Sequence, residues 1–236
     1  MVPIYNNKKS SDNMWSEELQ LKILKDVNVK FSQRIIAFDF ETKVLQETDF
    51  LSNETILGIN VARRLSSDEL EKTSFILEEE TLASQFKLLK QFSDLLLIWK
   101  PLVIVGYGIR FYDQPLLAIK NQLCLSHNQN AYGIKNVVNG AIFIELADLS
   151  TYVLLKNYNE KRKYMKMTEI MQHKHFSNLP FIKTKEFYSN SFNDKGKRIY
   201  EDWKNKDRKF LDYLDGEAYN QLLIAERIIE TELKVK

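Results

Sequence analysis

Residues 34–42 read Arg-Ile-Ile-Ala-Phe-Asp-Phe-Glu-Thr, and this stretch indicates the fold most clearly. β-Branched and aromatic residues dominate it, which is typical of a β-strand, and its apolar start is typical of a buried one. Asp39 and Glu41 stand two positions apart, so both carboxylates point to the same face of the sheet. Two like charges at the end of a buried strand repel each other and are costly to desolvate unless a cation lies between them.

Carboxylates held at short range by a rigid strand suit Mg²⁺ or Mn²⁺, because these hard cations prefer oxygen ligands and share them with substrate phosphates. A solvated strand end is the alternative interpretation of so short a motif. A third acid, Asp113, follows the apolar stretch 102–106 at the carboxyl edge, where open α/β sheets build their sites. Its alternative role is to cap the helix that begins there.

The rest of the chain predicts a mixed α/β fold. Strand-like segments at 55–63 and 73–77 with short spacers indicate an antiparallel meander with residues 34–42. A helical pattern over 79–99, the strand at 102–106, a helix to Leu125 and a strand at 142–146 then alternate as in parallel sheets. Asp148 is expected to cap the next helix. We therefore expect an RNase H-like mixed sheet, three antiparallel strands followed by parallel strands, with helices on both faces.

Composition excludes several classes of protein. The chain has 236 residues, 44% of them hydrophobic, which is enough for a substantial core. A single cysteine excludes an internal disulfide and a cysteine-rich zinc site. The absence of a long apolar run and of a signal peptide predicts a cytoplasmic protein with no membrane partner. We expect an N-terminal extension at 1–30 and one domain at 31–236.

A basic segment covers residues 156–209, where 15 Lys and Arg stand against 7 Asp and Glu. Aromatic residues are interleaved with the cations, a composition that suits single-stranded nucleic acid, because cations follow phosphates while aromatic rings stack on bases. A solvated insertion is the alternative. The cations assigned to nucleic-acid binding are Lys161, Arg162, Lys163 and Lys166.

Three motifs resemble those of a known family: FDFET at 38–42, GYGIRFYDQPLL at 106–117 and DYLDGEAYNQLLIAERI at 212–228. They are similar to the three exonuclease motifs of the DEDD superfamily of the RNase H-like fold. The similarity is greatest to the proofreading exonuclease domain of family B DNA polymerases, and it covers roughly residues 31–232. No polymerase-like sequence follows, so we expect a stand-alone nuclease.

In that family four acidic side chains hold two divalent cations, Mg²⁺ or Mn²⁺, in the two-metal arrangement of nucleases. The resemblance implies Asp39, Glu41, Asp113 and Glu217 as metal ligands and Tyr213 as the residue that orients the attacking water. It also assigns nucleic-acid contacts to Phe40, Thr42, Tyr107 and Phe111. This sequence departs from the family pattern at three positions: Gly108 replaces Asn, Tyr112 is inserted before Asp113, and Glu217 replaces Asp.

Helical periodicity selects Glu217 from the acids of the third motif. Over residues 208–234 the apolar residues define one buried stripe, with Glu217 on the same flank as Tyr213. Asp215 falls on the opposite flank and Asp212 points away. Tyr213 and Glu217 are i,i+4 neighbours, so both can reach one site.

The resemblance implies a metal-dependent 3′→5′ exonuclease that removes nucleotides from single-stranded DNA, in DNA replication or repair. The residues alone support metal-assisted phosphodiester chemistry on some nucleic acid, so RNA is an alternative substrate. The competing hypothesis is a catalytically weak or inactive RNase H-like module that binds nucleic acid or a replication partner. A site with no remaining function has no physical reason to keep three clustered carboxylates.

Overall fold

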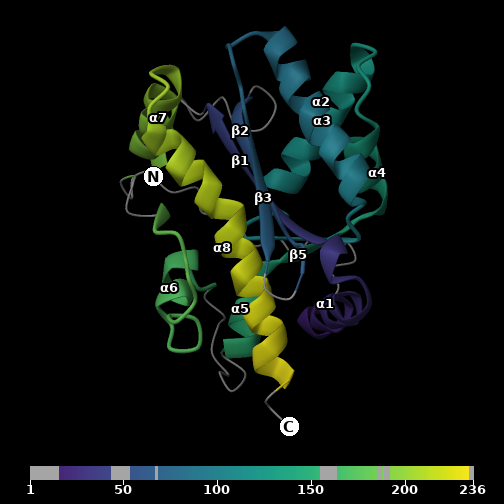
Figure 1. Ribbon diagram of the computed structural model, residues 1–236, viewed down its shortest axis with the longest axis vertical. Helices are drawn as coiled ribbons and strands as arrows, with labels where there is room; N and C mark the ends of the chain where they lie inside the picture. Colours follow the sequence, from purple (N-terminus) through teal and green to yellow (C-terminus); the bar gives the residue numbers. More distant parts are fainter. Residues whose placement is uncertain are drawn as a thin grey trace, which may run out of the picture.

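The computed structural model describes residues 16–43, 54–66, 69–154, 164–184, 188 and 192–233, with the backbone alone at 192–194 and 231–233. These residues form one five-stranded sheet with helices packed on both of its faces (Figure 1). No helix in these ranges combines the length and the apolar character that crossing a bilayer requires.

The sheet has the strand order β3-β2-β1-β4-β5. The antiparallel strands are β1 (Ile35–Lys43), β2 (Thr55–Arg64) and β3 (Leu70–Ile76). On the other side of β1 lie β4 (Val103–Gly106) and β5 (Ile142–Glu145), both parallel to it. This arrangement confirms the predicted α/β fold class. The central position of β1 explains its nearly continuous apolar start, because both of its faces are covered.

Helices α2, α3 and α4 cover one face of the sheet, and α1, α5 and α8 cover the other (Figure 1). Helix α1, within the expected N-terminal extension, packs on the body through Leu21 and Leu24, and a short 3₁₀ turn (Ser32–Arg34) links it to β1. The helices are α1 (Glu17–Phe31), α2 (Leu82–Trp99), α3 (Asp113–Ser126), α4 (Tyr132–Gly140), α5 (Leu146–Leu154), α6 (Met167–Gln172), α7 (Phe192–Lys204) and α8 (Arg208–Leu233).

Side chains of β1 alternate between the two faces. Phe38 and Phe40 pack with Phe92 of α2, with ring centroids 5.6 and 5.9 Å from that of Phe92. Ile35 and Ala37 lie in the core that α8 and α5 share. Because the period of a strand is two residues, Asp39 and Glu41 continue the row of Ile35 and Ala37 on the α8 face. The strand therefore directs both acids toward the last helix.

Two features of the middle of the chain were not evident from the sequence. Residues 156–205 of the basic segment contain two helices, α6 and α7. Most residues of α7 are charged or polar, so its sequence shows little of the apolar side that is buried. On that side the Trp203 indole N–H donates to the Leu77 carbonyl at 2.8 Å. Strand β5 ends at Glu145, so Asp148 lies inside α5. The Glu145 carboxylate accepts from the Ala147 N–H at 3.1 Å and does the capping expected of Asp148.

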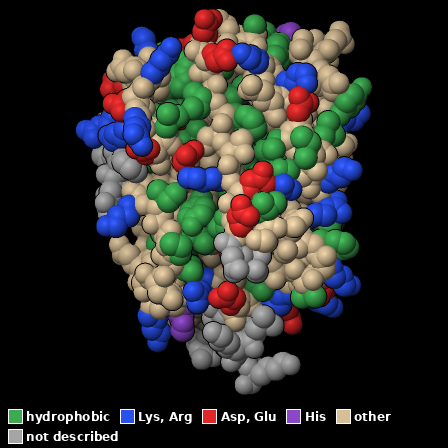
Figure 2. All heavy atoms as spheres, viewed as in Figure 1, with side chains coloured by type: hydrophobic (Ala, Val, Ile, Leu, Met, Phe, Trp, Pro, Cys, Tyr) green, Lys and Arg blue, Asp and Glu red, His purple; other side chains and the backbone are tan. Residues whose placement is uncertain are grey.

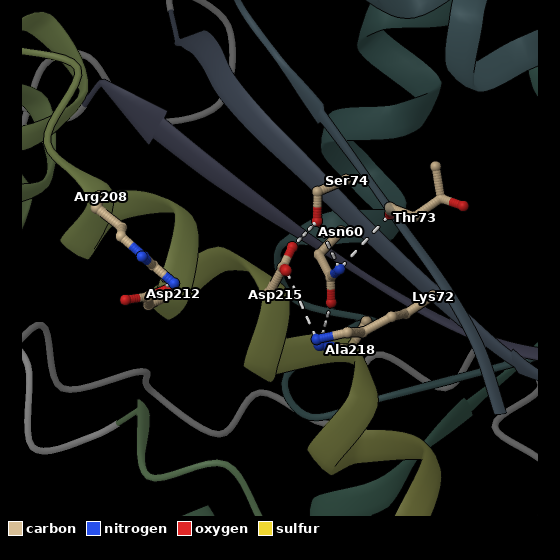
Figure 3. A network of polar contacts seen from close by, with 8 residues as sticks. All are labelled: Asn60, Lys72, Thr73, Ser74, Arg208, Asp212, Asp215 and Ala218. Carbon is tan, nitrogen blue, oxygen red and sulfur yellow. Dashed lines mark hydrogen bonds and ion pairs between the residues drawn. The ribbon is translucent and has the colours of Figure 1, made fainter.

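Asn60 of β2 fixes the position of α8 on the sheet. It lies beside Asp39 in the β1–β2 register, and Gly58 lies beside Glu41, where the missing side chain lets Leu214 of α8 approach. Asn60 accepts from the Ala218 N–H at 3.0 Å and donates to Ser74 Oγ at 2.9 Å (Figure 3). These contacts place the helix turn around Ala218 directly against the acid-bearing part of β1.

The close packing of α8 at Gly216 leaves no room for a side chain, which can be tested by mutation. A Cβ atom there would lie 2.1 Å from Thr184 Cγ2, and the segment that carries Thr184 is held to α8 by hydrogen bonds between Ile182 and Asn220. Alanine favours a helix by about 1 kcal/mol over glycine. We nevertheless expect Gly216→Ala to destabilise the protein by about 1–3 kcal/mol through overpacking, or about 2–4 °C in Tm per kcal/mol.

Gly140, at the end of α4, is the matched control, because a Cβ there meets nothing within 4 Å. Thermal unfolding of the two alanine variants checks the expectation. Equal melting temperatures for both variants would show that Thr184 yields easily and that the contact does not restrict α8.

Candidate active site

A cavity of about 800 Å³ opens at the carboxyl ends of β1 and β4. Its walls come from β1, the β4–α3 loop, α8, and the segments containing α6 and α7, so all three sequence motifs contribute to it. The lining residues are Asp39, Phe40, Glu41, Thr42, Tyr107, Gly108, Tyr112, Asp113, Lys166, Met167, Thr168, Glu169, Lys195, Gly196, Ile199, Tyr213, Glu217 and Gln221.

Asp113 is the first residue of α3 and lies buried beside β1. Its Oδ1 accepts from the Phe40 N–H at 3.2 Å, which ties the second motif to the first. Burial raises the pKa of Asp113 well above its usual range, and the negative charges of Asp39, Glu41 and Glu145 raise it further, against the lowering effect of the Phe40 N–H. A cation placed among these carboxylates would offset their repulsion.

Tyr213 and Glu217 lie one helical turn apart on α8, and both are buried against the cavity. Burial raises the pKa of Tyr213 well above its ordinary value, and the charges of Glu41, Glu217 and Asp39 raise it further. The hydroxyl therefore stays protonated at any ordinary pH and can donate a hydrogen bond. The Tyr213 ring packs perpendicular to that of Tyr188, with 4.8 Å between the ring centroids, and Lys195 Nζ lies over it at 5.1 Å from the ring centre.

The other acids of the third motif lie elsewhere. Asp215 accepts from Ser74 Oγ at 2.5 Å and pairs with Lys72 at 3.5 Å (Figure 3). Asp212 has a half-exposed side chain and lies 3.6 Å from Arg208. Neither lines the cavity, whereas Glu217 does and is 3% exposed.

The residues assigned to nucleic-acid contact fall into four groups. Tyr107 and Lys166 line the cavity, and Thr42 also lines it while hydrogen-bonded to the Tyr112 hydroxyl. Phe40 is also among the lining residues, but its ring is only 4% exposed and packs on Phe92 in the core, so it is not available for stacking on a base. Phe111 is 58% exposed and lies outside the lining. Lys161, Arg162 and Lys163 lie outside the described residues.

Glu145, which was not predicted from the sequence, supports the site from behind the β4–α3 loop. It is fully buried at the end of β5, and its carboxylate accepts from the N–H groups of Gly108 at 2.7 Å and of Arg110 at 3.4 Å. Burial raises its pKa, and these backbone bonds oppose the rise. Gly108 has a φ of 79°, a conformation that suits glycine. Glu145 thus holds the loop that leads to Asp113; the signal in the sequence was an acid at the end of an apolar strand.

The chemistry of the donor set fits divalent cations. Carboxylates of Asp39, Glu41, Asp113 and Glu217 line one cavity, and oxygen donors of this kind suit Mg²⁺ and Mn²⁺. Within the described ranges, however, no three acidic, histidine or cysteine side chains are already close enough to share one ion. Binding a cation would therefore require these side chains to move closer together than they lie here.

Comparison with known proteins identifies the fold. No protein-family model and no curated protein matches the sequence. Among solved structures, the chain is similar to the family B DNA polymerase from the hyperthermophilic archaeon Pyrobaculum calidifontis, with a TM-score of 0.55 and 18% sequence identity. The chain has the fold of part of that polymerase. The match covers 82% of this chain and 24% of the polymerase chain.

Proposed function

We propose that this protein is a metal-dependent 3′→5′ exonuclease that acts on single-stranded DNA. The observation that carries the proposal is the convergence of Asp39, Glu41, Asp113 and Glu217, with Tyr213, on one cavity. Residues from three motifs far apart in the sequence meet there, and they are the residues to which the DEDD resemblance assigns catalytic roles. The fold shared with part of a family B DNA polymerase supports the same reading. The polarity and the preference for DNA rest on the resemblance alone.

The four carboxylates would hold the two cations. When bound, such cations supply a nucleophilic hydroxide and neutralise the charge of the leaving oxygen. Tyr213 keeps its proton, because burial and three neighbouring carboxylates raise its pKa. Its hydroxyl can therefore donate to the attacking water and orient it, but it cannot act as the base. Phe40 helps position Asp113 through its backbone N–H.

Positive charge at the rim supports a phosphate-bearing substrate. Lys166 and Lys195 line the cavity, and Lys197 and Arg198 are exposed on α7 near it. Figure 2 shows Lys and Arg side chains gathered at the upper left, the region of α7 in Figure 1. Such cations attract nucleic acid of any sequence by neutralising phosphates.

A non-catalytic module is the second candidate, and one observation favours it. No three potential ligands in the described part of the chain are arranged to share an ion, and Glu217 stands where the family has Asp. Under this alternative the cavity would bind nucleic acid without cutting it. An exoribonuclease is the third candidate, because the described cations recognise phosphates and not the sugar.

Digestion of a 5′-labelled single strand with Mn²⁺ tests the proposal. We expect a ladder of products that shorten one nucleotide at a time from the 3′ end, and no cleavage in EDTA. Asp39→Ala protein, purified in the same way, controls for a contaminating nuclease. An RNA strand of the same sequence decides the sugar preference. Internal cuts, release of the 5′ label as a mononucleotide, or an uncut strand that remains bound would contradict the proposal.

A further inference from the structure

Gln221 lies one helical turn beyond Glu217, so Tyr213, Glu217 and Gln221 share one face of α8. It is 2% exposed and lines the cavity. Its Nε2 donates to Asp39 Oδ1 at 2.9 Å, and its Oε1 accepts from the Tyr107 N–H at 3.2 Å. The side chain therefore joins α8 both to β1 and to the loop after β4.

The chemistry of its partners fixes the orientation of this amide. A backbone N–H can only donate, so the amide oxygen must face Tyr107, and the amide NH₂ at the other side then donates to Asp39. Turning the amide over would break both bonds and leave buried polar groups unsatisfied. Gln221 therefore presents a fixed donor to one oxygen of Asp39.

We propose that Gln221 is a positioning residue for Asp39 and holds its carboxylate in the orientation that binds a divalent cation. This inference rests on the proposed function of the cavity. An ionised carboxylate has about four acceptor positions, so Asp39 can accept from Gln221 and still ligate an ion. Groups that hydrogen-bond to metal ligands orient them, and losing such a group typically weakens metal binding.

The two hydrogen bonds of the Gln221 side chain link the first and second sequence motifs. Asp39 belongs to the first motif and Tyr107 to the second, and the single amide of Gln221 restrains both from the helix that carries Glu217. The Tyr107–Gly108 turn is held on its other side by Glu145. Gln221 thus fixes the distance between Asp39 and the loop that leads to Asp113.

Mn²⁺ titration of the full chain without nucleic acid, followed by calorimetry or by the electron spin resonance of free Mn²⁺, tests the inference. Gln221→Leu removes both hydrogen bonds at similar volume, and we expect it to raise the Kd for Mn²⁺ by about 10–100-fold. Gln221→Met loses the same bonds with a longer, unbranched side chain, and the same rise is expected if the leucine variant does not fold.

Gln85→Leu is the matched control. Gln85 is 6% exposed, and its amide bonds both the N–H and the carbonyl of Ile56, but it does not line the cavity. We expect this variant to lower Tm while leaving the Kd for Mn²⁺ unchanged. A comparable loss of Mn²⁺ affinity in Gln85→Leu would show that general destabilisation, and not the contact with Asp39, weakens binding.

A double-mutant cycle asks whether Gln221 acts through Asp39. In an Asp39→Ala background, Gln221→Leu should change the Kd for Mn²⁺ by less than about twofold, because no carboxylate is left to orient. Equal Mn²⁺ binding by wild type and Gln221→Leu, or additive losses in the cycle, would overturn this inference and leave the proposed function intact. A wild type that binds no Mn²⁺ would overturn both.

Discussion

Asp113→Asn is expected to abolish cleavage of single-stranded DNA. The substitution keeps the size of the side chain and an oxygen that can accept from the Phe40 N–H, but it removes the charge that a cation requires. We expect turnover to fall by at least about 10³-fold, which corresponds to about 4 kcal/mol of lost transition-state stabilisation. Single-turnover digestion with Mn²⁺ measures the loss.

The same variant should be more stable than wild type when no metal is present. Folding raises the pKa of Asp113, so the folded state favours its protonated form. This favourable contribution is complete below the unfolded pKa of about 3.9 and is lost as the pH rises through the folded value. Asp113→Asn should therefore raise the metal-free Tm more at pH 8 than at pH 4.

Asp94→Asn controls for the change in net charge, because Asp94 is exposed on α2 and its ion pair with Lys90, at 2.6 Å, lies in solvent and contributes little to stability. We expect its activity and its Tm to stay close to those of wild type. Wild-type turnover in Asp113→Asn, or a metal-free Tm below that of wild type at pH 8, would show that Asp113 is a structural cap and not a metal ligand.

Glu217→Gln should lower activity by about 10²-fold or more, since losing one charged ligand removes about 3 kcal/mol of transition-state stabilisation. Glu217 lines the cavity with Tyr213, whose pKa its charge raises. Its longer side chain has more rotamer freedom than Asp, so we also expect higher wild-type activity with Mn²⁺ than with Mg²⁺. Initial rates with each metal check both expectations.

Asp215→Asn and Asp212→Asn are the matched controls for the third motif. Asp215 bonds to Ser74 and Lys72, and Asp212 lies at the surface beside Arg208. Both variants should keep near-wild-type activity. An inactive Asp215→Asn beside an active Glu217→Gln would mean that the side of α8 facing the site has been assigned wrongly.

The sequence predicted the fold well where its patterns were strong. β1 is buried on both faces, so its apolar start and its two acids indicated a buried strand with one acidic face. The periodicity of the last helix placed Glu217 and Asp215 on different sides, and the structure places them so. Patterns of this kind can be found in the sequence because each one lies within a single strand or helix.

The features that could not be predicted depend on contacts between elements far apart in the sequence, which no local sequence pattern reveals. Glu145 and Gln221 hold the loop after β4, but each looks like an ordinary polar residue until β5 and α8 are placed beside that loop. Helix α7 was missed because its buried side becomes apparent only where Trp203 meets Leu77. Phe40 was assigned to nucleic acid by its place in a motif, while its ring belongs to the core.

Anomalous diffraction from crystals grown with Mn²⁺ would test most directly whether this cavity binds divalent cations. We expect anomalous peaks between the carboxylates of Asp39, Glu41, Asp113 and Glu217, with Asp39 still bonded to Gln221. The peak nearest Glu217 should be lost in Glu217→Gln crystals. Mn²⁺ bound only at other places on the molecule, with this cavity empty, would contradict the account.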